Sequence, residues 1–232
     1  MKKFFTLIAT VAMATSMNAQ GTYAVQEGDN VKAGDQITSV ENITLTYMEN
    51  DGTAYAAVKK QTNWADADFN AYVCGKNNGK LVSGAEPTGC VYKFETAKAG
   101  AVTVGVQLNG NKGFHILDAE FTEVTPASYN LPSAKDGDSQ EFTENEKGEN
   151  IIGAKSNGTV TFSVAEGGTY YVLAAGTKMG FFGFKYEAGT STGISSIVAA
   201  SAKDGKTYNM AGQQVSSSFK GLVIKNGKKF VK

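Results

Sequence analysis

The sequence predicts an all-β protein whose main part is a two-sheet, jelly-roll-like β-sandwich, followed by a small C-terminal β unit. Three observations support this prediction. Apolar and polar residues alternate with a period of two over most of the chain from about residue 43 onward. Gly-rich turns separate the alternating runs, and no window of twelve residues keeps a helical period. About ten short strands with such turns are typical of a β-sandwich.

The alternating runs predict the individual strands. After the run that ends at Leu108, the turn residues Asn109-Gly110-Asn111 predict a hairpin into the next run. Residues Asp66 to Tyr72 are expected to form one helical turn at most. The predicted strands are Ile43 to Met48, Ala54 to Lys59, Val91 to Glu95, Val102 to Leu108, Gly113 to Leu117, Ala119 to Val124, Val160 to Val164, Thr169 to Ala175 and Phe181 to Tyr186.

The chain is predicted to consist of four segments. Lys2 and Lys3 precede an apolar run and then small and polar residues up to Ala19, which is the layout of a secretory signal peptide. Cleavage after Ala19 would make Gln20 the new N-terminus. The segments are the signal peptide (1–19), the β-sandwich (20–188), a Gly/Ser/Thr linker (189–193) and the C-terminal β unit (194–232). We therefore expect a protein that is secreted, periplasmic or held on the outer cell surface.

The C-terminal unit contains a further hairpin prediction. Gly221 to Ile224 turn at Asn226-Gly227 into the strand Lys228 to Val231. No stretch after the signal peptide approaches the roughly 20 consecutive apolar residues that a transmembrane helix needs.

The charged residues argue against several classes of function. The chain has 22 basic residues, all of them lysines, and 22 acidic residues. Arg supplies the planar fork that clamps phosphates and reads base edges, so its absence and the zero net charge argue against nucleic-acid binding. The charge is uneven, however, at +6 from Gly193 onward and −8 in the predicted sandwich. The C-terminal unit therefore has an electrostatic reason to dock on the sandwich or on an anionic surface.

The two cysteines permit two interpretations. In an oxidising compartment, Cys74 and Cys90 can form one disulfide. Alternatively, they are two small buried thiols, because the sequence does not supply the Cα separation that a disulfide requires.

The search for catalytic or metal-binding chemistry yields little. His115 is the only histidine, and its place in a strand pattern favours an ordinary strand residue over a functional one. The acidic run from Asp136 to Glu149 offers oxygen ligands for Ca²⁺, but its spacing does not match the twelve-residue calcium loop, and a solvated loop is the alternative. The sequence shows no catalytic set, so we expect a protein that is not an enzyme and needs no cofactor.

The only tryptophan suggests a binding site. Trp64 lies in a stretch too polar for a core strand, where an exposed ring beside Asp and Asn side chains would suit a sugar. The alternative is that Trp64 plugs one end of the sandwich. The candidate glycan-binding residues are Trp64, Asp66, Asp68, Asn70 and Tyr72.

Two parts of the chain resemble known families. The pattern Tyr208-Asn209-x-x-Gly212-Gln213-x-Val215, with Lys220-Gly221-x-x-Ile224-x-x-Gly227-Lys228-Lys229, resembles the sorting domains of proteins exported by type IX secretion, at about half their length. The segments Pro87 to Phe94, Thr103 to Leu108 and Gly176 to Phe184 resemble β-sandwich modules appended to bacterial pectin-degrading and other polysaccharide-active enzymes. The second resemblance implies a noncatalytic role in glycan binding or spacing.

These observations leave three hypotheses. The first is an exported, noncatalytic β-sandwich protein that binds an extracellular glycan or a surface protein. The second is a structural or adhesive surface protein without a sugar site. The third and weakest is a polysaccharide lyase that works without Arg and uses Lys and Tyr, with Ca²⁺ or Lys178 neutralising the uronate.

Overall fold

The computed structural model describes residues 20–49 and 68–189 in full, and the backbone of the strands at 56–60, 207–209, 222–225 and 228–231. These residues form strands and turns, and no helix occurs among them. The chain divides into two units, Met1–Thr190 and Ser191–Lys232. The first unit contains two large antiparallel sheets, which confirms the predicted all-β sandwich.

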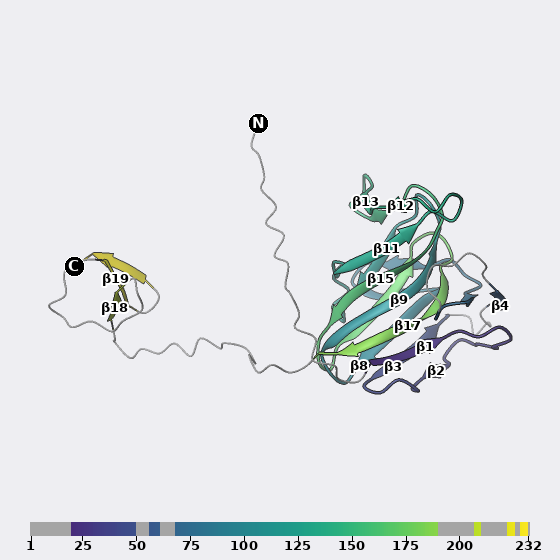
Figure 1. Cartoon of the computed structure of the whole chain (residues 1–232), viewed down its shortest axis with the longest axis horizontal. Helices are drawn as coiled ribbons and strands as arrows, with labels where there is room; N and C mark the ends of the chain where they lie inside the picture. Colours follow the sequence, from purple (N-terminus) through teal and green to yellow (C-terminus); the bar gives the residue numbers. More distant parts are fainter. Residues whose placement is uncertain are drawn as a thin grey trace. The chain divides into compact units, whose positions relative to one another are not determined.

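The larger sheet has eight strands. Its order is β12-β11-β15-β9-β17-β5-β4, and β1 also pairs with β17. In Figure 1, β11, β15, β9, β17 and β1 follow one another across this sheet. The strands are β1 (Gln20–Ala24), β4 (Ala56–Lys60), β5 (Ala71–Cys74), β9 (Gly100–Leu108), β11 (Ser128–Pro132), β12 (Ser139–Gln140), β15 (Ser156–Val164) and β17 (Gly180–Ala188).

The second sheet has seven strands in the order β13-β14-β10-β16-β8-β3-β2. From β8 onward, each step between the long strands β8, β9, β10, β15, β16 and β17 crosses from one sheet to the other. This alternation gives the sandwich its jelly-roll-like character. The strands are β2 (Gln36–Ile37), β3 (Ile43–Met48), β8 (Val91–Thr96), β10 (Phe114–Leu117), β13 (Thr143–Glu144), β14 (Asn150–Ile151) and β16 (Thr169–Ala174).

Two small sheets complete the described structure. In the first unit, β6 (Lys80–Val82) and β7 (Ala85–Thr88) form a hairpin. In the second unit, β18 (Thr207–Asn209), β19 (Leu222–Lys225) and β20 (Lys228–Val231) form an antiparallel sheet. The pairing of Lys225 with Lys228 confirms the predicted hairpin in the C-terminal unit.

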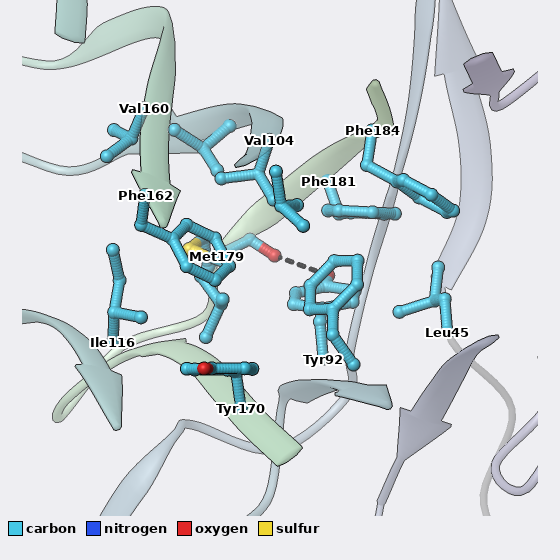
Figure 2. Close-up of a cluster of buried hydrophobic side chains, with 14 of the residues drawn as sticks. Leu45, Tyr92, Val104, Ile116, Val160, Phe162, Tyr170, Met179, Phe181 and Phe184 are labelled. Atoms are coloured by element: carbon cyan, nitrogen blue, oxygen red, sulfur yellow. Dashed lines mark hydrogen bonds between the residues drawn. The ribbon is translucent and has the colours of Figure 1, made fainter. Parts of the chain in front are cut away.

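The hydrophobic core lies between the two large sheets. In β3, Ile43, Leu45 and Tyr47 are buried while the residues between them are not, as the two-residue period requires. Figure 2 shows side chains of β9, β15 and β17 on one side of the cluster, and side chains of β3, β8, β10 and β16 on the other. The rings of Tyr92 and Phe181 stack between the layers with their centroids 4.4 Å apart.

Two predictions about the connections are wrong. The turn after Leu108 does not close a hairpin, because β9 pairs with β15 and β17 whereas β10 belongs to the other sheet. The predicted strand Ala119 to Val124 is a loop that folds back by a single bridge between Leu117 and Glu123. In that loop the Asp118 carboxylate accepts hydrogen bonds from the backbone nitrogens of Glu120 and Thr122, which stabilises a turn instead of a strand.

The predicted signal peptide and linker lie mostly outside the described residues. Among the described residues, no segment forms an apolar helix long enough to cross a bilayer.

Candidate functional site

Only part of the predicted glycan site lies within the described residues. Trp64 and Asp66 lie outside the described residues. The other three, Asp68, Asn70 and Tyr72, come immediately before or within β5, at one end of the larger sheet.

Asp68 and Tyr72 both contact the outer face of β17. The Asp68 carboxylate lies 2.8 Å from Lys185 Nζ, which is also 5.3 Å from the centre of the Phe69 ring. Tyr72 packs against Phe182, with 5.3 Å between the ring centres. The structure therefore brings these two predicted residues to one sheet face, where both make contacts within the protein.

An irregularity in β17 explains why aromatic residues gather on this outer face. The pairing of β17 with β9 shifts register between Phe181 and Gly183, so Phe181 points into the core while Phe182 points outward. Gly105 leaves room for this cluster, because a Cβ there would lie 2.8 Å from the Phe69 ring. Phe69 and Phe182 are both fully buried, although they lie outside the main core between the two sheets.

A polar recess lies beside the β6–β7 hairpin. It has a volume of about 360 Å³ and is lined by Asn77, Asn78, Lys80, Thr88 and Gly89. The pairing of Lys80 with Thr88 holds the two strand ends of its wall together. Gly79 N donates to Thr177 O at 2.8 Å, and this bond ties the same wall to the loop before β17.

A buried carboxylate holds one side of the recess in place. Glu49 is only 9% exposed, at the end of β3. Its two oxygens accept hydrogen bonds from Asn77, one from the backbone nitrogen at 3.1 Å and one from Nδ2 at 2.9 Å. Hydrogen bonds to a charged acceptor are stronger than neutral ones, so Glu49 fixes both the backbone and the side chain of Asn77.

Close contact between two backbone segments forms the other side. Gly89 has a φ of 82°, and a Cβ there would lie 2.1 Å from the carbonyl oxygen of Asn78. Only glycine fits both this conformation and this contact. From the sequence, Asn77, Asn78 and Gly89 are recognisable only as residues typical of turns. Their local pattern does not show that Glu49, directly after β3, supplies the carboxylate that orients Asn77.

The two cysteines flank the segment that lines this recess. Both are free thiols, and Cys90 is fully buried while Cys74 is half-buried. Cys90 Sγ accepts a hydrogen bond from Gly75 N at 3.3 Å and lies 3.4 Å from the Met179 carbonyl oxygen. A side-chain hydrogen bond with Cys74, helped by Tyr92, Met179 and Gly75 and opposed by burial, lowers the pKa of Cys90 to about 7. In this structure the two residues are therefore neighbouring thiols.

His115 lies between two carboxylates that its strand pattern did not suggest. Its Nδ1 is hydrogen-bonded to the Glu123 carboxylate, and its Nε2 lies 3.7 Å from Glu149 Oε1. The side chain is 3% exposed, and Nε2 has no hydrogen-bond partner among the described residues. Because this nitrogen is buried, a substrate cannot reach it, and the cluster joins β10 to the loops that carry Glu123 and Glu149.

The acidic run is distributed over turns. Glu141 accepts a hydrogen bond from the Tyr129 hydroxyl, and Glu149 accepts one from Asn145 Nδ2 at 2.6 Å. Asn145 also caps its own turn by accepting from the backbone nitrogens of Lys147 and Glu149. Within residues 20–49 and 68–189, no group of three His, Cys, Asp or Glu residues has an arrangement suited to a metal ion.

Comparisons with known proteins give no relative: no protein-family model matches the chain, and no curated protein matches it.

Proposed function

We propose that this chain is an exported, noncatalytic β-sandwich protein that binds glycan in the recess beside the β6–β7 hairpin. The observation that carries the proposal is the chemistry of the lining. Two amides, a hydroxyl and an ammonium group surround one recess. Amides and hydroxyls both donate and accept hydrogen bonds, as sugar hydroxyls do, so the lining and the ligand are complementary.

The rigidity of the recess supports a binding role. Glu49 holds Asn77 through two hydrogen bonds, and the contact between Gly89 and Asn78 fixes the backbone. A site that is already ordered loses less conformational entropy when a ligand binds. The described lining residues include neither a carboxyl pair nor an imidazole, so we assign binding to this recess and not bond cleavage.

Export is proposed from the sequence of residues 1–19, which has the layout of a secretory signal peptide. The positive C-terminal unit remains a candidate sorting or docking element on the basis of its charge and its resemblance.

A glycan array with residues 20–232 tests this proposal. We expect Lys80→Met and Thr88→Val to weaken binding to the best glycan by about tenfold each, since each removes one polar contact worth about 1.4 kcal/mol. Lys112→Met, at an exposed lysine outside the recess, is the matched control. Unchanged binding by both recess variants would refute the assignment. Loss of binding in Trp64→Ala alone would move the site to the tryptophan segment.

A second candidate function is assembly, and one observation favours it. Leu81 and Val82, on β6, are 43% and 41% exposed and are the large hydrophobic residues most open to solvent in the described structure. Adjacent exposed apolar residues favour a protein contact, for which we consider a second copy of this chain. Sedimentation velocity over a concentration series tests this candidate. Association abolished by Leu81→Ser with Val82→Ser, in a protein that binds no glycan on the array, would replace the first proposal with this one.

A further inference from the structure

The recess and the two cysteines belong to one segment of chain. Cys74 is the last residue of β5, and Cys90 directly precedes β8. All five lining residues lie between them in the sequence: Asn77, Asn78, Lys80, Thr88 and Gly89. A covalent bond between the two cysteines would therefore close the whole recess-forming segment into a ring.

The structure brings the two side chains into direct contact. The backbone nitrogen of Gly75, the residue after Cys74, donates to Cys90 Sγ at 3.3 Å, and a hydrogen bond between the Cys74 and Cys90 side chains lowers the pKa of Cys90. Gly75 follows Cys74, and a Cβ at position 75 would lie 2.7 Å from Cys90 Sγ. Because glycine has no side chain, its backbone can lie directly against this sulfur. Tyr92 and Met179 hold Cys90 from the other side. Both cysteines are thus fixed in place, one by β5 and the other by the core.

We propose that Cys74 and Cys90 are a reversible disulfide site that controls the rigidity of the recess. The two side chains are free thiols in the structure, and the oxidised form would close the ring from residue 74 to residue 90. The effect on ligand affinity rests on the proposed function, whereas formation of the disulfide does not.

The exposure of the two residues gives the order of the steps, with a small disulfide such as oxidised glutathione as the oxidant. Half-buried Cys74, as its thiolate, attacks one glutathione sulfur; the glutathione S–S bond breaks and one glutathione thiolate leaves. Cys90, as its thiolate, then attacks Cys74 Sγ, and the second glutathione thiolate leaves. The cysteines lose two protons and two electrons, and the oxidant gains them as two glutathione thiols.

The surroundings of Cys90 suit it to the second step. Cys90 must be ionised to resolve the mixed disulfide, because the thiolate is the nucleophile in disulfide exchange, and the hydrogen bond from Gly75 N to its sulfur favours that form. Its complete burial protects it from direct attack by the oxidant. The mixed disulfide with glutathione therefore forms on Cys74, and the buried Cys90 then displaces the glutathione.

The first experiment follows the thiols of the reduced chain, residues 20–232, in mixtures of reduced and oxidised glutathione at pH 8. Samples are quenched with N-ethylmaleimide in denaturant and examined by intact mass and peptide mapping. We expect a monomer with no alkylated cysteine and a 74–90 cross-link, and a Tm higher by about 5–10 °C. Two alkylated cysteines at every ratio would overturn the proposal.

Variants test the order of the steps. In Cys90→Ala we expect the glutathione adduct on Cys74 to accumulate, because the resolving thiolate is gone. In Cys74→Ala we expect Cys90 to stay reduced, because the oxidant cannot reach it. An adduct on Cys90 in that variant would contradict the assigned order. The wild-type measurement needs no substitution, so it remains decisive even if a variant folds poorly.

A second readout separates the disulfide from the binding function. Amide hydrogen exchange over residues 76–89 should slow by about tenfold or more on oxidation, with β9 and β15 as internal references, and unchanged exchange would overturn control of rigidity. The glycan array is then repeated with both forms, and we expect about three- to tenfold tighter binding by the oxidised form. Equal binding by both forms would overturn the coupling, whereas no glycan binding by either form would overturn only the proposed function.

Discussion

The hydroxyl of Tyr92 donates a 2.8 Å hydrogen bond to the backbone carbonyl of Met179 inside the core, the interaction drawn as a dashed line in Figure 2. The bond connects the second sheet to the segment that leads into β17, within a core made mostly of apolar side chains. It also lies beside Cys90, whose sulfur is 3.5 Å from the same hydroxyl.

We expect Tyr92→Phe to lower the free energy of unfolding by about 1–2 kcal/mol, because the Met179 carbonyl loses its best donor in a buried place. Urea unfolding measures this change. The control is Tyr129→Phe, whose hydroxyl meets the exposed carboxylate of Glu141 and should matter by less than about 0.5 kcal/mol. Equal effects of the two variants would show that burial of the bond is unimportant.

Two glycines separate backbone conformation from steric contact. Gly84, with a φ of 65°, has open space where a Cβ would be, whereas a Cβ on Gly89 would meet Asn78 O at 2.1 Å. We expect Gly84→Ala to cost about 1–2 kcal/mol, from conformation alone. Gly89→Ala should cost about 3 kcal/mol or more, because the backbone must also move. Thermal unfolding of both variants measures the difference, and a smaller loss in Gly89→Ala would contradict the close contact.

Tyr171 makes the stability of the sandwich sensitive to alkaline pH. Burial, and then the hydrogen bond to Glu86, raise the pKa of its hydroxyl to about 12 from the ordinary 10. Between pH 10 and 12 the unfolded chain releases this proton while the folded chain keeps it, so the free energy of unfolding falls as the pH rises. Below pH 10 the contribution is fully present.

The alkaline effect is measured as the difference between wild type and Tyr171→Phe, because several other tyrosines titrate in the same range. Absorbance at alkaline pH should show one phenol fewer near pH 12 in the variant. In Glu86→Gln that phenol should titrate at lower pH, yet still above 10, because burial is the larger cause. If Tyr171→Phe instead removes one tyrosine that titrates near pH 10, the pKa of the Tyr171 hydroxyl is not raised.

Adjacent residues before β5 should differ sharply in importance. Phe69 is fully buried on the outer face, and Phe69→Ala should lower the free energy of unfolding by about 3–5 kcal/mol. The side chain of Asp68 is 58% exposed in its pair with Lys185, and Asp68→Asn should cost about 0–1 kcal/mol. Denaturant unfolding at low and high salt measures both. If Asp68→Asn lowered the free energy of unfolding by clearly more than about 1 kcal/mol even at high salt, the Asp68–Lys185 pair would be stronger than a surface ion pair.

Local patterns predict the strands well but not their partners. The alternation of Ile43 to Met48 matches β3 at both ends, because one face of that strand is buried and the other is not. The turn at Asn109-Gly110-Asn111 carries the residue types of a hairpin, yet the chain continues into the opposite sheet. The residue types of a turn predict that the chain reverses direction there. Which strands then pair with each other depends on the packing of the whole sandwich.

The candidate site is less accessible to sequence reasoning than the strands. Asn77 and Lys80 belong to polar turns, and their grouping depends on Glu49, which lies 28 residues before Asn77. The sequence permits either a disulfide or two buried thiols for Cys74 and Cys90, and in the structure both are free thiols close to each other. The register shift in β17 turns Phe182 to the outer face of the sheet, where it is nevertheless fully buried, and the local pattern does not show this shift. Each difference arises from contacts between residues far apart in the chain.

The position of β17 determines when the sandwich can assemble. This last strand of the sandwich pairs with β9 on one side and with β5 and β1 on the other. A chain that is still being synthesised therefore holds three strands with open edges until residues 180–188 are added. Pairings between distant residues form slowly, so we expect the larger sheet to be completed late, when β17 joins the beginning of the domain to its end. Until that step, the nascent chain depends on whatever shields its strand edges from other chains.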